Sequence, residues 1–423
     1  DIPRLVFGNL ETLIHIGQGA RNISLMGLGF RDTSATYMKE KAWGVPSGGD
    51  WALYRGGAVV IENATDVTIE DGIFSRLDGN GVFLSRMTRG VSISNNVFEW
   101  LGENAVATWG ETDGYDARSG SQPRGSVFEL NYVHDIGIYE KQSSAWGQAK
   151  ACMSTLASNV LFNLPRAAIN LNDQLGGGNH IHDNVIWNAC RESGDHGPIN
   201  TWDRMPFLTN LRTSSDGSDT TSTFTPLPTT IANNLIMANY GASQGVDNDD
   251  GSSWFLIENN VFYAADGFKM DYGGHDSTFR SNLIVVVPYD GQNCYDVEDF
   301  QPNHAHRFFN NTCVSGVSPN RVNSGCSSPL TCPRGEIKDT RLVAAVDMDL
   351  VGSAAACNQD VGGSFLSSSN RFFSLHGNAS ITCEGRTLDI SAAQKAYGIE
   401  SGSTFGKLPD ADQILAWAKE LLR

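Results

Sequence analysis

The segment 191–204 has the greatest density of side chains suited to acid–base chemistry. It reads Arg-Glu-Ser-Gly-Asp-His-Gly-Pro-Ile-Asn-Thr-Trp-Asp-Arg. Two carboxyl groups at a suitable separation can cleave a glycosidic bond, one as the acid and the other as the base or nucleophile. We predict Asp195 as the acid, because its neighbours Pro198 and Trp202 can exclude water from its carboxyl group, as a general acid requires.

A second carboxyl group is predicted from a short repeated pattern. The segments 169–173 and 199–203 both read Ile-Asn-x-x-Asp. If they align on adjacent coils of a solenoid, the residues just before the second copy bulge outward beside Asp173. Neighbouring strands lie about 4.8 Å apart, which brings acids on adjacent coils into the range for sugar hydrolysis. We therefore predict Asp173 as the base or nucleophile beside Asp195, and the remaining members of the catalytic cluster are Glu192, His196 and Asp203.

The alternative is a structural role, in which these acids cap turns or pair with nearby arginines. Arg166, Arg191 and Arg204 are the available partners. Acids serve such structural roles far more often than catalytic ones. The density of the 191–204 segment favours a functional cluster.

Two later segments add polar groups to the same predicted cleft. The segment 247–253 reads Asp-Asn-Asp-Asp-Gly-Ser-Ser and resembles half a calcium loop, but it lacks the glutamate and the flanking helices of that motif. We therefore expect no cofactor, with Ca²⁺ as the less favoured alternative. The segment 269–276 contains His275. This residue either extends the cleft by one coil or makes only structural hydrogen bonds within a turn.

The segment 139–148 precedes Asp173 by one coil and suits sugar binding. Aromatic rings stack on the apolar face of a pyranose, and amides bind its hydroxyl groups. The alternative is that Trp146 is buried in the core. The predicted substrate-binding residues are Lys141, Gln142, Trp146, Arg166, Asn170, Trp202, Arg204, Asp249, Asp250 and His275.

A repeat of Asn followed by a short apolar run predicts the fold that positions these groups. Its base spacing is 22 to 26 residues, with longer intervals where loops are inserted. This spacing suits one coil of three short strands, and the regular leucines of leucine-rich repeats are absent. We predict an all-β, right-handed parallel β-helix of at least eight coils. The repeated asparagines are Asn96, Asn131, Asn159, Asn184, Asn234, Asn260, Asn282 and Asn311.

These asparagines have a physical reason to recur before each strand. Asn tolerates the left-handed backbone conformation of a sharp turn. Stacked Asn side chains can also form a hydrogen-bonded ladder.

The repeat fades after about residue 320, which gives the predicted domains. Residues 1–320 form the β-helix, and residues 321–423 form a disulfide-stapled extension. Short helices are expected at 391–398 and 409–422, where they cap or flank the solenoid. The longest insertion lies between Asn184 and Asn234 and includes a Ser- and Thr-rich loop at 213–225.

The formal charge of −17 and the pI of about 4.9 argue against two classes of partner, and the alternative is an acidic surface that serves solubility alone. Nucleic acids and anionic membranes both need basic surface. Strongly anionic polysaccharides are weakly disfavoured for the same reason. The sequence has no apolar run of the length that a membrane-spanning helix needs, so we expect no membrane insertion.

The cysteines and glycosylation sequons favour a secreted, extracellular protein. We predict Cys326–Cys332 and Cys357–Cys383 as the likeliest disulfides, from their proximity in sequence. The other cysteines predicted in disulfides are Cys152, Cys190, Cys294 and Cys313. The Asn-x-Ser/Thr sequons, and so the predicted glycosylation sites, are at Asn22, Asn63, Asn310 and Asn378.

Five segments together carry a resemblance to a known group of proteins. They are Gly-Ile-Tyr-Glu-Lys-Gln-Ser at 137–143, Pro-Arg-Ala-Ala-Ile-Asn at 165–170, Glu-Ser-Gly-Asp-His-Gly-Pro at 192–198, Asn-Thr-Trp-Asp-Arg at 200–204, and the 247–253 segment. Residues 60 to 310 resemble right-handed β-helix proteins of bacteria, algae and other protists. Part of that group consists of glycoside hydrolases that act on xylan and fucose-containing glycans. The resemblance implies the fold and glycan cleavage, and it does not assign the catalytic pair.

Three functions follow from the sequence. The first is a secreted glycoside hydrolase with a polysaccharide or glycan as its partner. The second is a non-catalytic structural, filament-forming or glycan-binding protein, for which stackable coil ends would permit self-assembly. The third is a polysaccharide lyase, in which Lys141, Arg166 or His196 would assist proton abstraction.

Overall fold

The computed structural model describes most of the chain, and its residues fall into two compact units. The first unit contains Asp1–Val185 and Trp202–Thr229, and the second contains Ile186–Thr201 and Thr230–Arg423. Each unit is described by itself below. The described residues are 8–37, 39, 43–44, 51–114, 116–172, 176–202, 207–212, 224–237, 243–270, 273–286, 294–297, 301–315, 350–354, 365–374, 376–383 and 386–423.

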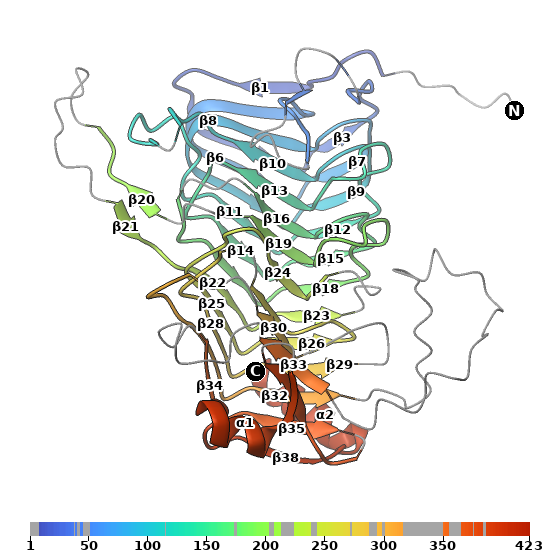
Figure 1. The fold of residues 1–423 in the computed structure, drawn as a ribbon. Helices are drawn as coiled ribbons and strands as arrows, with labels where there is room; N and C mark the ends of the chain where they lie inside the picture. Colours follow the sequence, from blue (N-terminus) through green and yellow to red (C-terminus); the bar gives the residue numbers. More distant parts are fainter. Residues whose placement is uncertain are drawn as a thin grey trace, which may run out of the picture. The chain divides into compact units, whose positions relative to one another are not determined.

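The first unit consists of parallel strands stacked in three rows (Figure 1). One row pairs β1–β6–β8–β10–β13–β16, the second pairs β2–β6–β8–β11–β14–β17, and the third pairs β3–β7–β9–β12–β15. The bounds are β1 Ile14–Ile16, β2 Arg21–Met26, β3 Gly29–Arg31, β4 Trp43–Gly44, β5 Leu53–Tyr54, β6 Val59–Glu70, β7 Ile73–Leu77, β8 Val82–Ser94, β9 Val97–Leu101, β10 Val106–Trp109, β11 Val127–Glu129, β12 Tyr132–His134, β13 Trp146–Ala149, β14 Thr155–Ala157, β15 Val160–Phe162, β16 Ile169–Asn172, β17 His180–His182, β20 Phe207–Thr209 and β21 Phe224–Pro226.

The second unit repeats this arrangement. Its rows pair β19–β24–β27–β30–β33–β36, β22–β25–β28–β31–β34 and β23–β26–β29–β32–β35–β38. The bounds are β18 Val185–Trp187, β19 Ile199–Trp202, β22 Thr229–Ala232, β23 Leu235–Met237, β24 Val246–Asn248, β25 Phe255–Glu258, β26 Val261–Tyr263, β27 Phe268–Met270, β28 Thr278–Arg280, β29 Leu283–Val286, β30 Tyr295–Val297, β31 His306–Phe309, β32 Thr312–Ser315, β33 Leu350–Ala354, β34 Phe365–Ser368, β35 Arg371–Ser374, β36 Ser380–Cys383, β37 Arg386–Asp389 and β38 Thr404–Lys407.

These rows confirm an all-β architecture of long, stacked parallel sheets. The first rows of the two units contain six strands each, twelve in all among the described residues, which exceeds the eight coils predicted. The right-handed sense of the coil stays a prediction.

Ladders of buried asparagines join successive coils, as predicted. In the first unit each Asn Nδ2 donates to the Oδ1 of the next asparagine, at 3.1, 3.1 and 2.9 Å along Asn96, Asn131, Asn159 and Asn184. In the second unit the same bond recurs at 2.9, 3.0, 3.1 and 3.3 Å along Asn234, Asn260, Asn282, Asn311 and Asn370. Because these amides are buried, each lost partner would leave a polar group unsatisfied, which costs about 1–3 kcal/mol.

The left-handed backbone conformation is not at the ladder asparagine, where the sequence predicts it. It occurs at the residue before the ladder asparagine, for example Asn95, Ser158 and Asn259, with φ values of 54°, 54° and 56°. The ladder asparagine itself must turn its side chain inward to reach the next coil. The prediction therefore assigned both the left-handed turn and the ladder hydrogen bond to one asparagine. In the structure the preceding residue forms the turn, and the asparagine forms the hydrogen bond.

Stacked aromatic rings fill the interior of each unit. In the first unit Phe30, Phe74 and Phe98 follow one another with ring centroids 4.5 Å apart. In the second unit Phe279 lies between Phe262 and Phe308, at 5.6 and 5.4 Å. Burial of each such side chain contributes about 1.5–3 kcal/mol.

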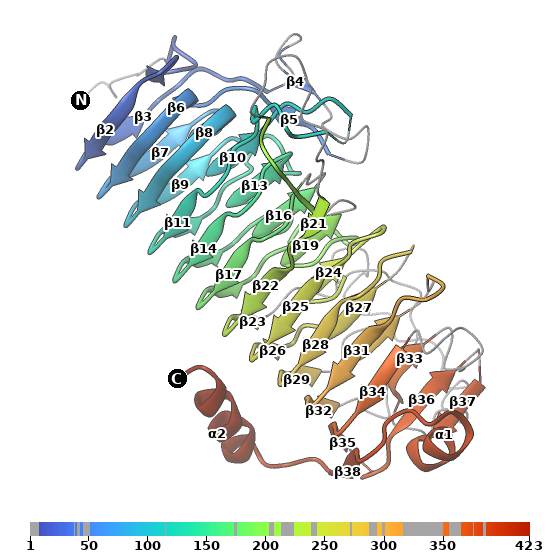
Figure 2. The ribbon, with the colours of Figure 1, turned by 90° about the vertical axis from the view of Figure 1, so that its left-hand side faces the viewer.

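The predicted C-terminal helices are present as α1 (Ile390–Tyr397) and α2 (Ala411–Leu421). Helix α2 begins at Asp410, whose carboxylate accepts the Gln413 N–H at 2.8 Å. Its apolar side packs on residues of the β23–β26–β29–β32–β35 row, and the rings of Trp417 and Phe373 lie 5.3 Å apart (Figure 2). The helix therefore flanks the second unit along its side. Neither helix in the described part of the chain is long and apolar enough to span a membrane.

Candidate functional site

A column of polar and charged residues runs along the outer side of the first row in the second unit. The register pairs Asn200 with Asp247 and Lys269 with Asp296, while Val246 pairs with Phe268 one position earlier. Side chains alternate along a strand, so these residues point away from the core, which contains Val246 and Phe268. We call Asn200, Asp247, Lys269 and Asp296 the charged column.

Lys269 contacts two carboxylates, one in β24 and one in the turn that follows it. Its Nζ lies 2.6 Å from Oδ1 of Asp247 and 3.5 Å from Oδ1 of Asp249. The two oxygens are therefore no more than about 6.1 Å apart, the sum of these two distances. The Asp247 side chain is fully buried, whereas Asp249 and Lys269 retain 27% and 16% exposure, so only the latter two are accessible to solvent.

Asp247 is held in an environment that opposes its negative charge. Burial raises the pKa of this carboxyl group, and the Lys269 ammonium opposes the rise without cancelling it. The Asp249 carboxylate adds to the rise, and His196 acts in the same direction as Lys269. Among the residues that the structure describes, Oδ2 of Asp247 has no hydrogen-bond partner, although it is buried.

The Asp-His-Gly turn of the preceding coil closes over Asp247. A Cβ atom on Gly197 would lie 2.0 Å from the Gln244 carbonyl oxygen and 2.9 Å from Cβ of Asp247, so only glycine fits there. His196 is buried, and its Nδ1 lies 2.6 Å from the Ser193 hydroxyl. Gly197 therefore lies close to Asp247 of the charged column, and Asp195 precedes Gly197 by two residues in the sequence.

The predicted catalytic residues divide into those that the structure describes and those outside it. Asp195 and Glu192 are exposed, so Pro198 and Trp202 do not shield Asp195 from water as predicted. His196 is buried beside Asp247, and Asp249 and Asp250 are half-buried in the turn after β24. The residues outside the described part of the chain are Asp173, Asp203 and Arg204.

The predicted sugar-binding residues of the first unit are mostly internal. Trp146 is fully buried, and its indole N–H donates to Oε1 of Gln148 at 2.8 Å, so it belongs to the core. Arg166 and Asn170 are buried too, with 1% and 0% exposure. Lys141 is exposed and Gln142 half-buried, so these two alone of that group offer surface to a ligand. Trp202 is half-buried.

Sequence reasoning missed the pairing of Asp247 with Lys269. The signal was present, because the two residues are 22 positions apart and the ladder asparagines Asn260 and Asn282 have the same spacing. Residues one repeat apart occupy matching places on adjacent coils.

A second missed group is Glu103 in the first unit. This side chain is fully buried, and burial raises its pKa to about 8. The Thr36 hydroxyl donates to Oε1 and lowers the pKa, while the charge of Glu140 raises it. Burial also raises the pKa of Glu140, which accepts the Gln142 N–H at 2.8 Å. Glu103 is out of reach of solvent, so we treat it as a buried structural acid.

The cysteines follow the predictions in part. Cys294 and Cys313 form a disulfide with Cα atoms 6.0 Å apart, and Cys383 is also disulfide-bonded. Cys152 and Cys190 are buried thiols, so the prediction of disulfides at these two positions is wrong; the Cys152 Sγ instead lies 3.8 Å from Oε1 of Gln122. Cys326, Cys332 and Cys357 lie outside the described part of the chain.

The sequons at Asn22, Asn310 and Asn378 have exposed asparagines, and Asn63 is half-buried. Glycosylation stays a prediction at all four positions.

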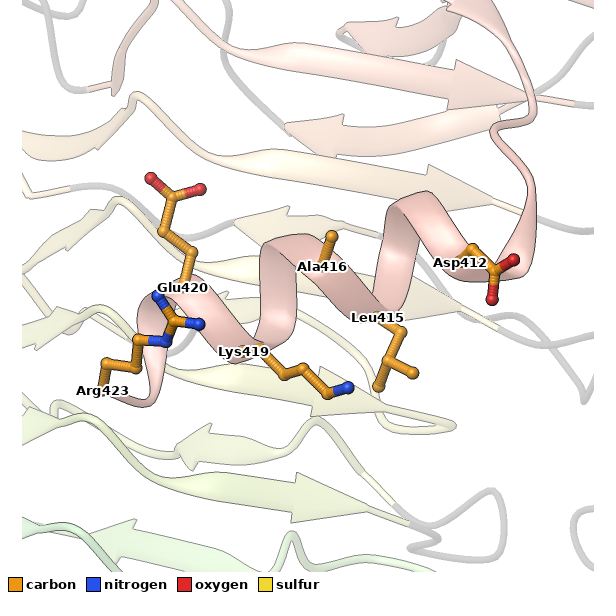
Figure 3. A pocket seen from close by; sticks show the side chains of 6 residues that line it. All are labelled: Asp412, Leu415, Ala416, Lys419, Glu420 and Arg423. Atoms are coloured by element: carbon orange, nitrogen blue, oxygen red, sulfur yellow. The ribbon is translucent and has the colours of Figure 1, made fainter.

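A hollow of about 440 Å³ lies on the outer side of α2 (Figure 3). It is lined by Asp412, Leu415, Ala416, Lys419, Glu420 and Arg423. All six residues belong to one helix or its end, so no second element of the described chain encloses a ligand there. The hollow is not a candidate site.

Comparison with known proteins adds no relative: neither a protein-family model nor a curated protein matches this chain. The site is therefore interpreted from its own geometry.

Proposed function

We propose that this chain is a secreted, right-handed parallel β-helix that hydrolyses a glycan at the turns carrying Asp195 and Asp249. The observation that supports the proposal most strongly is the Lys269 ammonium, which contacts the carboxylates of both Asp247 and Asp249. This contact fixes the partly exposed carboxylate of Asp249, two residues after Asp247, the residue that Gly197 of the Asp195 turn approaches closely.

The two exposed acids take different roles in this proposal. Asp249, whose carboxylate lies 3.5 Å from the Lys269 ammonium, takes the role of the base or nucleophile. Asp195 is the acid that protonates the leaving oxygen in this proposal, although its carboxyl group is exposed rather than shielded by Pro198 and Trp202. These two roles need carboxyl groups about 5 to 9.5 Å apart, which is the separation that the proposal requires of Asp195 and Asp249.

Asp247 and His196 act as positioning residues beneath this pair. Asp247 is buried and cannot touch a substrate, but its 2.6 Å contact orients the Lys269 ammonium. His196 lies beside Asp247 and fixes the Asp-His-Gly turn through Ser193. Loss of either group would misplace an exposed acid without removing it.

The geometry favours hydrolysis over the lyase alternative. A lyase needs a cation that neutralises the uronate carboxylate of its substrate. Lys269 already contacts two carboxylates of the protein, so it offers little charge to a third.

A polysaccharide panel tests the proposal. We expect the unaltered chain to generate new reducing ends without new ultraviolet absorbance of unsaturated uronates. Asp249→Asn and Asp195→Asn should each reduce the rate by about 10²–10⁴-fold, the usual contribution of acid–base catalysis.

Asp71→Asn is the matched control for these variants. It makes the same chemical change at an exposed turn of the first unit, and it should leave the rate unchanged. Absorbing products would indicate a lyase. Binding without products would indicate the structural or glycan-binding alternative, and either result would overturn the proposal.

A further inference from the structure

His275, Asp276 and His304 converge on one point in the second unit. Nδ1 of His275 lies 2.9 Å from Oδ2 of Asp276, and Nδ1 of His304 lies 2.5 Å from the same oxygen. The two imidazole rings have centroids 4.1 Å apart. One candidate ligand atom from each residue lies within 4.8 Å of the other two. Three groups that bind metals therefore share one small volume.

The turn between β27 and β28 is built to hold this arrangement. Asp276 adopts a left-handed conformation, with φ of 54°, and its Oδ1 accepts the Ala305 N–H of the next coil at 3.4 Å. On the other side, the Ser253 hydroxyl accepts the His275 N–H at 3.1 Å. Neighbouring coils thus fix the backbone on both sides before any ligand arrives.

A fourth histidine supports the turn from beneath. His306 is buried, and its Nε2 donates to the Gly274 carbonyl at 3.0 Å. Its Nδ1 accepts the Ser277 N–H at 3.4 Å. Both ring nitrogens are engaged by backbone groups, so His306 positions the turn and is not a ligand.

We propose that His275, Asp276 and His304 bind one divalent transition-metal ion of the Zn²⁺, Cu²⁺, Ni²⁺ or Co²⁺ class. Two imidazoles and one carboxylate suit these ions, whereas Ca²⁺ and Mg²⁺ prefer sites made of oxygen ligands. The ion would join the turn before β28 to the turn before β31, on adjacent coils. This site is separate from the glycan site proposed above and does not depend on it.

The distances fit an ion after a small adjustment. Zn²⁺ binds imidazole nitrogen at about 2.0–2.1 Å, which places two tetrahedral ligands about 3.3 Å apart. The two N–O distances of 2.9 and 2.5 Å must therefore widen by less than 1 Å. The side chains of His275 and His304 retain 25% and 41% exposure, so they have room to move outward and an ion has a route of entry. Water would complete the coordination.

Zinc binding to the full chain, stripped with a chelator and measured by calorimetry, tests the proposal. We expect one Zn²⁺ per chain and an affinity lowered at least about tenfold by His275→Ala, His304→Ala or Asp276→Asn. His182→Ala is the matched control, because His182 pairs with the adjacent Asp183 at 2.7 Å in the same way. Among the described residues no metal-binding group includes His182, so His182→Ala should leave zinc binding unchanged.

Trp254 provides a second readout that depends on location. Its ring lies 6.3 Å from that of His275, so Cu²⁺ bound at the site should quench its fluorescence. Trp254→Phe should abolish the quenching while one Cu²⁺ still binds. The proposal is overturned if the chain binds no Zn²⁺ at micromolar concentrations. It is also overturned if His304→Ala, shown to be folded by circular dichroism, binds zinc as the unaltered chain does.

Discussion

Glu103→Gln should change how the stability of the chain depends on pH. Glu103 is fully buried in the first unit, and burial raises its pKa from 4.5 to about 8. The folded chain therefore keeps a proton on Glu103 that the unfolded chain releases between pH 4.5 and 8. Stability is fully present below pH 4.5 and falls as the pH rises through this window, because ionisation favours the unfolded chain.

The magnitude follows from the same numbers. Each pH unit within the window costs about 1.4 kcal/mol, so the full fall from pH 4.5 to 8 is about 5 kcal/mol. Glutamine has no charge to lose and lacks this contribution. Its amide N–H₂ would replace Oε2, which has no hydrogen-bond partner among the described residues, at a cost of about 1–3 kcal/mol at every pH. The test is therefore how the difference in unfolding free energy changes with pH, and not its value at any one pH.

Urea unfolding at pH 5, 6, 7 and 8, followed by circular dichroism, measures this slope. The unfolding free energy of Glu103→Gln relative to the unaltered chain should rise by about 1.4 kcal/mol per pH unit. Thr36→Val removes the hydrogen bond that lowers the Glu103 pKa, so its stability should continue to fall at higher pH. Parallel curves for Glu103→Gln and the unaltered chain would refute the argument that a buried, protonated carboxyl group lies at this position.

Two further substitutions test the packing that supports the site and the C-terminus. Gly197→Ala places a methyl group 2.0 Å from the Gln244 carbonyl oxygen, so it should destabilise the second unit by at least about 2 kcal/mol; an unchanged melting temperature would contradict this close contact. Trp417→Ala removes the ring that packs on Phe373, so it should weaken the docking of α2 by about 2 kcal/mol and speed proteolysis before the helix. An unchanged cleavage rate there would show that α2 is held by other contacts.

The stacked parallel architecture could be predicted because its signal is local and repeated. Each Asn-led apolar run encodes one strand and one ladder position, and the 22-residue spacing of Asn260 and Asn282 is one whole coil. The depth of individual side chains could not be predicted in this way. Trp146 looks like a sugar platform in sequence, yet its position on β13 points it into the core. Alternation determines the buried face only once the register is known.

The groups that the sequence missed depend on contacts between distant segments. Glu103 is covered partly by Thr36, 67 residues earlier, and no local pattern connects them. His304 reaches Asp276 across an irregular turn 28 residues later, where the repeat has no strand residues to align. Asp247 and Lys269 are the exception, since their separation equals one coil and repeat alignment would have paired them.

Initial rates of reducing-end formation on the best polysaccharide of the panel test the central claim most directly. The unaltered chain and Asp71→Asn should cleave at equal rates. Asp249→Asn should be slower by about 10²–10⁴-fold while it still binds the polysaccharide. A rate for Asp249→Asn equal to that of Asp71→Asn would contradict the claim that the carboxylate held by Lys269 performs the chemistry.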